Sequence, residues 1–233
     1  MRAAVLSDIH SNLEALRAVM KFIDTLEVTD IFCLGDLVGY GPHPNECVEL
    51  IRERSAIVLK GNHDAGATGE LDPDHFNAYG RAALDWTKTV LSDENSSFLA
   101  SLPMTAEREG AFLVHSSPAK PENWRYVLTW REAQECFQAF TTPVCFIGHT
   151  HVSVVIGEQG TVNAFERETR QLINVGSVGQ PRDGNHRASF GLIDTDQWTY
   201  QNYRIEYDIQ KTVDAITAAQ LPEYLGRRLF LGI

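Results

Sequence analysis

The sequence predicts an α/β protein, a four-layer αββα sandwich in which two mixed β-sheets face each other and helices cover their outer sides. Two observations indicate this class. In residues 3–59, short apolar segments alternate with amphipathic ones, which is the pattern of a βαβαβ unit. From residue 112 onward, short apolar segments recur at turn-like spacing, which predicts a further set of strands.

The predicted elements of the first half are, in order, a strand at 3–6, a helix after residue 12, a strand at 30–34, a helix at 44–54 and a strand at 56–59. Asn12 is expected to cap the first helix, whose apolar residues follow the 3.6-residue period. Residues 72–101 are predicted to be helical with a break near Ser92, and to form one side of a functional site.

The second half is predicted to contain strands at 112–114, 144–147, 152–156, 161–165, 172–174, 189–193 and 200–205. The apolar end Leu229–Leu231 is expected to pack on the core or on another subunit. No linker, internal repeat or low-complexity segment interrupts the chain. Residues 1–233 are therefore expected to form a single domain.

Nearly all side chains suited to metal binding lie in five short segments, each of which follows a strand-like run. The segments are Ser7–His10, Gly35–Asp36, Gly61–Asp64, Val114–Ser116 and Gly148–His151. A parallel or mixed sheet presents the loops that follow its strands at one edge, where functional residues collect. We therefore expect these five segments to meet in one site.

The ligand types indicate the chemistry of this site. Asp and His bind Fe, Mn, Zn, Co and Ni, whereas a set of oxygen ligands alone favours Mg or Ca. About eight ligands exceed the needs of one ion, so we expect two ions that share a carboxylate, with Asp36 as the natural bridge. Two cations about 3.5–4 Å apart can hold a hydroxide and stabilise both the attacking and the leaving oxygen at phosphorus. The site therefore suits phosphate ester hydrolysis.

The order Asp-x-His, Gly-Asp, Gly-Asn-His-Asp, His and Gly-His-Thr-His resembles the calcineurin-like metallophosphoesterase family. The resemblance extends through Asn174–Arg182, which is similar to the small bacterial and archaeal phosphodiesterase branch, and covers about three quarters of the chain. It implies the αββα fold, with one metal held by Asp8, His10, Asp36 and His151 and a second by Asp36, Asn62, His115 and His149. It leaves His63 without a metal, beside the leaving group.

The candidate catalytic residues are His63 and Asp64, and the candidate substrate-binding residues are Asn62 and Arg182. A neighbouring carboxylate raises the pKa of an imidazole, so His63 supported by Asp64 is expected to stay protonated and to act as a general acid. Asn62 adds an oxygen ligand without a negative charge that would repel phosphate. Arg182 can pair with a non-bridging phosphate oxygen through its planar guanidinium.

Two departures from the family pattern narrow the expected activity. Phosphoprotein phosphatases and similar dinucleoside tetraphosphatases follow Gly-Asp with Val-Asp-Arg-Gly, and they have Gly-Asn-His-Glu further on. Here Gly35–Gly41 contains no Arg, and the later motif ends in Asp64. The missing Arg disfavours a dianionic monoester more than a singly charged diester.

We therefore expect a metal-dependent phosphoesterase that acts on phosphodiesters or small phosphomonoesters by attack of a metal-bound hydroxide. The alternatives are a phosphoprotein phosphatase and a non-catalytic interaction scaffold of the same fold. A scaffold has no chemical need for a proton donor, so the presence of His63 beside a complete ligand set favours the enzyme. The expected cofactors are two divalent transition-metal ions, with manganese preferred over Fe, Zn, Ni or Co.

Composition restricts the partners. The formal charge of −11 and the pI near 5.1 argue against binding of extended nucleic acid or an anionic membrane. No apolar run approaches the ~20 residues of a membrane span, and the first predicted strand leaves no room for a signal peptide. Four isolated cysteines are expected to be buried in a reducing compartment. The sequence therefore predicts a cytoplasmic enzyme for a small phosphoester, whose oligomeric state it leaves open.

The remaining candidate side chains lie outside the five segments. His75 is excluded as a solvent-facing residue at a helix start, and His186 is expected in a solvated loop. His43 follows Asp36 and is assigned equally to the rim of the site or to substrate contact. Trp124 and Tyr126 are expected to pack in the fold or to line the substrate cleft.

Overall fold

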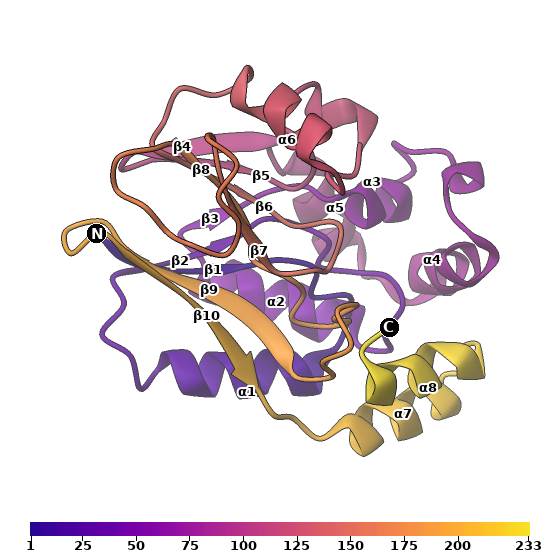
Figure 1. The fold of residues 1–233 in the computed structure, drawn as a ribbon. Coiled ribbons are helices and arrows are strands. Elements are labelled where there is room, and N and C mark those ends of the chain that lie inside the picture. The colour runs from indigo at the N-terminus through magenta and orange to yellow at the C-terminus, as the bar shows by residue number, and fades with distance from the viewer.

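The computed structural model describes residues 1–233 and contains two five-stranded sheets that face each other, with helices on their outer sides (Figure 1). The first sheet has the order β10-β9-β1-β2-β3 and the second the order β4-β5-β6-β8-β7. The strands of the first sheet are β1 (Arg2–Leu6), β2 (Asp30–Cys33), β3 (Ile57–Val58), β9 (Ala188–Asp194) and β10 (Thr199–Ile205). Those of the second are β4 (Thr105–Arg108), β5 (Ala111–Val114), β6 (Val144–Ile147), β7 (Val154–Gly157) and β8 (Gln171–Asn174).

The helices lie on both outer sides of the sheets and at the end where the chain terminates. They are α1 (Leu13–Ile23), α2 (Pro44–Arg54), α3 (Asn62–Thr68), α4 (Ala78–Val90), α5 (Asp93–Ser101), α6 (Trp130–Phe137), α7 (Ile209–Ala218) and α8 (Glu223–Leu231), with short 3₁₀ helices η1 (Pro73–His75) and η2 (Pro121–Asn123). In Figure 1, α1 and α2 lie below the first sheet and α6 lies above the second. This arrangement confirms the predicted αββα sandwich.

Three apolar clusters fill the spaces between the four layers. Val5, Phe32 and Phe146 belong to the cluster between the two sheets. Leu16 and Ile51 belong to the cluster that joins α1 and α2 to the first sheet. A third cluster packs α6 against the second sheet through residues that include Phe137 and Cys145. Each sheet is thus buried on both faces, as expected for parallel strands with near-continuous apolar sequence.

Both sheets contain parallel pairs, and this decides where the loops lie. β1 pairs with β2 and β2 with β3 in parallel, while β5 pairs with β6 and β6 with β8 in the same sense. Parallel neighbours end at the same edge, so the loops after β1, β2 and β3 lie together at the edge of the first sheet. The loops after β5 and β6 lie at the edge of the second sheet. The five segments therefore come from two facing sheets.

The first helix forms as its sequence predicts. The Asn12 side chain accepts a hydrogen bond from the backbone N–H of Ala15 at 3.2 Å and caps α1. The apolar positions of α1 are buried against the first sheet. Ser92 caps α5, which confirms the break expected within 72–101.

Several elements differ from the prediction. Residues 161–165 do not form a strand, because only Val162 bridges to Ile156 and Asn163 has a φ of 58°, which interrupts the extended conformation. The elements β4, α3, α6, α7 and α8 were not predicted. For α6 the signal was present, since Thr129 and Glu132 form a capping box.

The C-terminal helices α7 and α8 pack against the loop that carries Tyr40. Leu229 is buried in this cluster, whereas Phe230 and Leu231 are exposed. All four cysteines are buried and free, as predicted. None of the helices has both the length and the apolar character needed to cross a bilayer.

Candidate metal centre

All five predicted segments converge where the strand ends of the two sheets meet. Their backbone is unusual, because Asp8, His10, Asp36, His149 and His151 all have φ between 49° and 67°. Residues other than glycine rarely adopt this left-handed conformation, which costs free energy and is concentrated at functional sites. The fold therefore holds these five side chains in place against a local conformational preference.

Backbone carbonyl groups fix the orientation of three imidazole rings. His10 Nδ1–H donates to the carbonyl of Val38 at 3.1 Å, and His151 Nδ1–H donates to that of Gln180 at 2.6 Å. His149 Nε2–H donates to the carbonyl of Trp124 at 2.9 Å. Because one nitrogen of each ring is the donor, the other nitrogen presents a lone pair to the centre. This is the arrangement by which outer residues orient metal-binding histidines.

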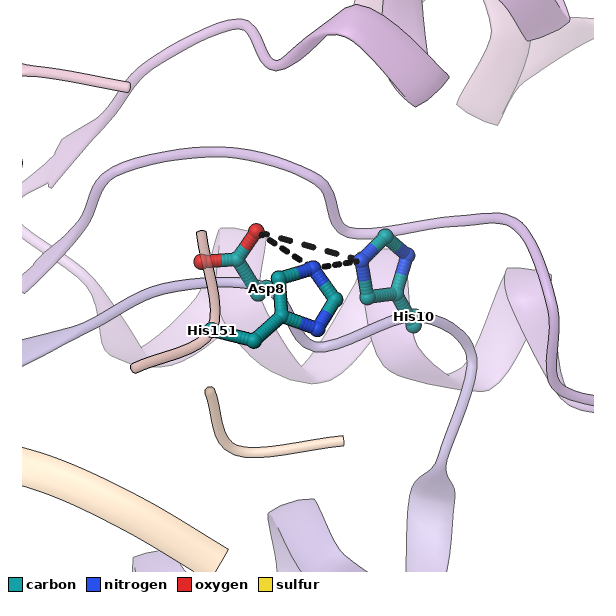
Figure 2. Close-up of side chains that lie close together, drawn as sticks. All are labelled: Asp8, His10 and His151. Carbon is teal, nitrogen blue, oxygen red and sulfur yellow. Dashed lines mark hydrogen bonds and ion pairs between the residues drawn. The ribbon is translucent and has the colours of Figure 1, made fainter. Parts of the chain in front are cut away.

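The first group of ligand atoms comprises Asp8, His10 and His151. Figure 2 shows the Asp8 carboxylate and the two rings pointing toward one another. His10 Nε2 lies 3.1 Å from His151 Nε2, and His151 Nε2 lies 3.2 Å from Asp8 Oδ1. All three atoms present lone pairs at this spacing. They repel one another unless a cation lies between them, so the group fits a metal ion.

The second group comprises Asp36, His115 and His149, and Asn62 lines the same cleft as His149. His115 Nε2 lies 3.2 Å from His149 Nδ1 and 3.4 Å from Asp36 Oδ2. Asn62 is buried, and its Oδ1 atom has no hydrogen-bond partner. A buried carbonyl oxygen without a partner is costly, and a cation would satisfy it.

Asp36 lies between the two groups. Its Oδ1 accepts a hydrogen bond from the backbone N–H of His63 at 2.8 Å. Its Oδ2 lies 3.6 Å from His10 Nε2 in the first group and 3.4 Å from His115 Nε2 in the second. The position of this oxygen suits the bridging role predicted for Asp36. The donor set of carboxylate, imidazole and amide oxygen also suits two transition-metal ions.

The electrostatics of the centre favour added positive charge. Burial lowers the pKa of His149 to about 3 and also lowers that of His10, so both rings remain neutral ligands near pH 7. Burial also opposes charge on His115, but Asp36 and Asp8 outweigh it and raise the pKa of His115 to about 9. Burial would raise the pKa of Asp36, yet the surrounding imidazoles lower it. The pKa of Asp8 is lowered in the same way, so Asp8 and Asp36 are ionised and attract a cation.

Two glycines allow the segments to approach this closely. A Cβ atom on Gly61 would lie 2.0 Å from Asp36 Oδ1, and one on Gly148 would lie 2.5 Å from Asp8 Oδ2. No side chain fits at either position without displacing a predicted ligand. The glycines of the Gly-Asn-His-Asp and Gly-His-Thr-His motifs therefore let the backbone pack directly against the carboxylates of Asp36 and Asp8.

The contact predicted between Asp64 and His63 is absent. Asp64 Oδ2 accepts hydrogen bonds from the backbone N–H groups of Asp36 at 2.8 Å and Gly61 at 3.0 Å, and Oδ1 accepts from Leu37 at 2.9 Å and Val38 at 3.2 Å. Asp64 and His63 are consecutive in α3, and consecutive helical side chains do not face each other. Asp64 thus holds the loop that carries Asp36 instead of supporting the His63 ring.

His63 lies beside the first ligand group, with one ring nitrogen within 4.8 Å of ligand atoms of His10 and Asp36. Its ring contacts those of His10, Tyr40 and Phe76 at centroid distances of 4.8, 4.5 and 4.8 Å, and its Nδ1 has no hydrogen-bond partner. Burial lowers the pKa of His63 to about 4, against the opposing effect of Asp36. Asp64 bonds to backbone N–H groups and not to this ring, so the protonation of His63 by a neighbouring carboxylate stays a prediction.

Arg182 lies next to the first ligand group. Its backbone N–H donates to the carbonyl of His151 at 3.2 Å, and its side chain donates to Gln180 Oε1 at 2.9 Å. The guanidinium lies 5.7 Å from the centre of the Tyr40 ring. Burial is the largest cause that lowers the pKa of His151, and the positive charge of Arg182 is the second largest. Arg182 is thus close enough to add positive charge at the edge of the centre.

An open cleft of about 410 Å³ adjoins the second ligand group. Its lining consists of Asn62, Leu71, His75, Glu122, Asn123, Trp124, Tyr126 and His149. The Tyr126 ring stacks on that of His149 at 4.1 Å and 12°. Trp124 and Tyr126 were expected either to pack in the fold or to line a cleft, and in the structure both line this cleft. His75 is exposed as predicted, and it borders this cleft while lying outside the groups of ligand atoms.

Two other histidines lie outside the centre. His43 precedes α2, and its Nδ1 lies 3.6 Å from Glu46 Oε1. His186 is exposed and lies 3.3 Å from Glu206, as expected for a solvated loop. Neither borders the cleft.

The fold and the centre together define a metal-dependent phosphoric ester hydrolase. The model of the calcineurin-like phosphoesterase superfamily domain matches residues 1–198, and the chain belongs to that superfamily.

Sequence similarity to known proteins covers nearly the whole chain. An uncharacterized protein of Methanocaldococcus jannaschii is 44% identical, covering 98% of this chain and 97% of the relative. The crystal structure of a metallophosphoesterase from Sphaerobacter thermophilus is 42% identical and superposes with a TM-score of 0.89, covering 100% of this chain and 99% of that one. Phosphodiesterase YfcE of Escherichia coli is 24% identical, covering 84% of this chain and 89% of YfcE.

Proposed function

We propose that this protein hydrolyses phosphodiesters or small phosphomonoesters with two bound divalent metal ions, manganese being the preferred metal. The observation that carries the proposal is the pair of ligand groups on either side of Asp36 Oδ2, which lies 3.6 Å from His10 Nε2 and 3.4 Å from His115 Nε2. The name of its relative YfcE, a phosphodiesterase, supports the same class of reaction.

In this proposal Asp8, His10, Asp36 and His151 hold one ion, and Asp36, Asn62, His115 and His149 hold the other. When bound, two such ions activate a water molecule and neutralise charge that develops at phosphorus. The chain contributes the orientation of the ligands, since the carbonyls of Val38, Gln180 and Trp124 fix the rings. Hydrolysis consumes one water, breaks one P–O ester bond and releases an alcohol.

His63 is the proposed general acid. Its ring packs against that of His10 beside the centre, and it lies outside the two proposed ligand sets. An anionic phosphate nearby raises the pKa of an imidazole, as Asp36 already does in part. Binding of the substrate thus supplies the charge that Asp64 does not provide, and it lets His63 deliver a proton to the leaving alkoxide.

Arg182 is the proposed partner of a non-bridging phosphate oxygen. It is the cation beside the first ligand group, while the loop from Gly35 to Gly41 contains no Arg. One guanidinium matches the single negative charge of a diester better than the two charges of a monoester. We therefore propose diesters as the better substrates.

The test compares His63→Ala with the wild type on diesters that differ in their leaving groups. A positioned general acid contributes about 10²–10⁴-fold to rate, so an alkyl or ribose ester should lose that much. Nitrophenolate departs with little help from a proton, so hydrolysis of bis(p-nitrophenyl) phosphate should fall much less. Metal content should stay near that of the wild type.

His186→Ala provides the matched control, because His186 lies outside both the cleft and the ligand groups and its side chain is 43% exposed. It should not alter the dependence of rate on the pKa of the leaving group. Equal losses for all leaving groups in His63→Ala would exclude the acid role, and loss of metal would make His63 a ligand.

A further inference from the structure

The cleft beside the second ligand group is larger than a phosphate with small alkyl groups requires. Its volume of about 410 Å³ lies within the range of about 300–1,000 Å³ that is typical of pockets for organic ligands. Asn62 and His149 are among its lining residues, and both belong to the proposed ligand set. A group attached to a phosphate at the centre therefore extends into this cleft.

Two aromatic residues of the cleft are fixed to the centre. The Tyr126 ring stacks on His149, and the carbonyl of Trp124 accepts the Nε2–H of the same His149 ring. Trp124 has a φ of 50°, so the chain adopts a strained conformation to place it here. Tyr126 remains 46% exposed, which leaves ring surface available for a ligand. A flat group can stack there at a defined distance from phosphate.

The rim of the cleft is polar. The exposed side chains of His75, Glu122 and Asn123 offer hydrogen-bond donors and acceptors around the aromatic surface. A nucleobase combines a stacking face with a polar edge, whereas a plain phenyl or alkyl group leaves these partners unused. The formal charge of −11 and the carboxylate of Glu122 disfavour a long polyanionic strand.

We propose, building on the phosphoesterase function above, that one ester group of the substrate is a nucleoside whose base lies in this cleft against Trp124 and Tyr126. The substrate is then a small nucleotide diester, either a dinucleotide or a nucleotide joined to a small alcohol. Stacking on an aromatic side chain tolerates every base, so the proposal concerns the class and not one base.

The first test compares kcat/KM for adenylyl-adenosine with kcat/KM for glycerophosphoethanolamine, a diester without an aromatic group. Tyr126→Leu should lower the ratio of these two values by about 5- to 100-fold, the usual effect of losing one stacked base. Tyr126→Phe keeps the ring and should preserve the ratio. Trp130→Leu is the matched control, because Trp130 is also partly exposed but lies outside this cleft. An equal loss for both substrates would show that Tyr126 acts only through His149.

The second test measures binding and separates this proposal from the proposed function. Calorimetric titration of the metal-loaded protein should show adenosine 5′-monophosphate binding about 5- to 100-fold more tightly than ribose 5-phosphate. Equal affinities would overturn the nucleoside subsite even if bis(p-nitrophenyl) phosphate is hydrolysed. Failure to hydrolyse any ester would instead overturn the proposed function, while a preference for the nucleotide would still support a nucleotide-binding cleft.

Discussion

Replacing Asp64 by Asn tests whether this carboxylate holds the loop that carries Asp36. The wild-type carboxylate accepts four backbone N–H groups, two on each oxygen. Asn keeps one accepting oxygen and replaces the other with an NH₂ group that cannot accept. Two buried N–H groups therefore lose their partners in Asp64→Asn.

The size of the effect follows from this count. Each unpaired buried donor costs about 1–3 kcal/mol, so the variant should lose about 2–6 kcal/mol of stability. In a chain of this length 1 kcal/mol corresponds to about 2–4 °C, and a central loss of about 4 kcal/mol lowers Tm by about 8–16 °C. Total stabilities are usually about 5–15 kcal/mol, so the variant should still fold.

Differential scanning calorimetry of the metal-free proteins measures this loss without a contribution from bound ions. Asp93→Asn serves as the control, because Asp93 is an exposed residue in the first turn of α5 and should change Tm little. The metal affinity of Asp64→Asn should also fall, since the loop before α2 loses its attachment. A Tm within about 2 °C of the wild type would refute the role given to Asp64.

Two pairs of substitutions test the centre itself. Gly39→Ala should lower activity while metal content persists, because the new Cβ atom would lie 2.4 Å from His63 Nδ1. Gly69→Ala is the control. Gly69 has a similar positive φ, but a Cβ atom there meets no neighbouring atom, so this variant should keep its activity. Unchanged kcat in the first variant, measured with an alkyl diester, would contradict the placement of His63. Asp36→Ala should reduce the occupancy of both metal sites in elemental analysis, whereas His151→Ala should mainly affect one. Two fully occupied sites in Asp36→Ala would show that the bridge is misassigned.

The convergence of the five segments could be predicted because each follows an apolar strand. Parallel strands end at a common edge, so the order of the motifs already placed their loops together. The division of these strands between two sheets depends on long-range pairing. β1 pairs with β9, whose residues lie near the other end of the chain, and no local pattern indicates such a pairing.

The orientation of the rings could not be predicted, because backbone atoms fix it. The carbonyls of Val38, Gln180 and Trp124 accept the ring N–H groups, and any residue type supplies a carbonyl. The left-handed backbone conformation of Asp8 and His10 could not be predicted from the sequence either, since neither side chain requires it.

The error over Asp64 came from reading adjacency as contact. The sequence predicts a loop at Gly61–Asp64, whereas α3 begins at Asn62. In a helix, side chains three or four positions apart are neighbours, and Asp64 at the third position accepts from the N-terminal backbone. This capping position directs the Asp64 carboxylate toward the N–H of Gly61 and away from the His63 ring.

The central claim is that this chain binds two metal ions and needs them for hydrolysis. The most direct measurement titrates the metal-free protein with Mn²⁺ and follows bound metal and hydrolysis of bis(p-nitrophenyl) phosphate in the same samples. We predict about two ions per chain, activity that rises with the second equivalent, and recovery by Co²⁺ or Ni²⁺ but much less by Ca²⁺. Full activity in a sample shown by elemental analysis to contain no metal would contradict the account.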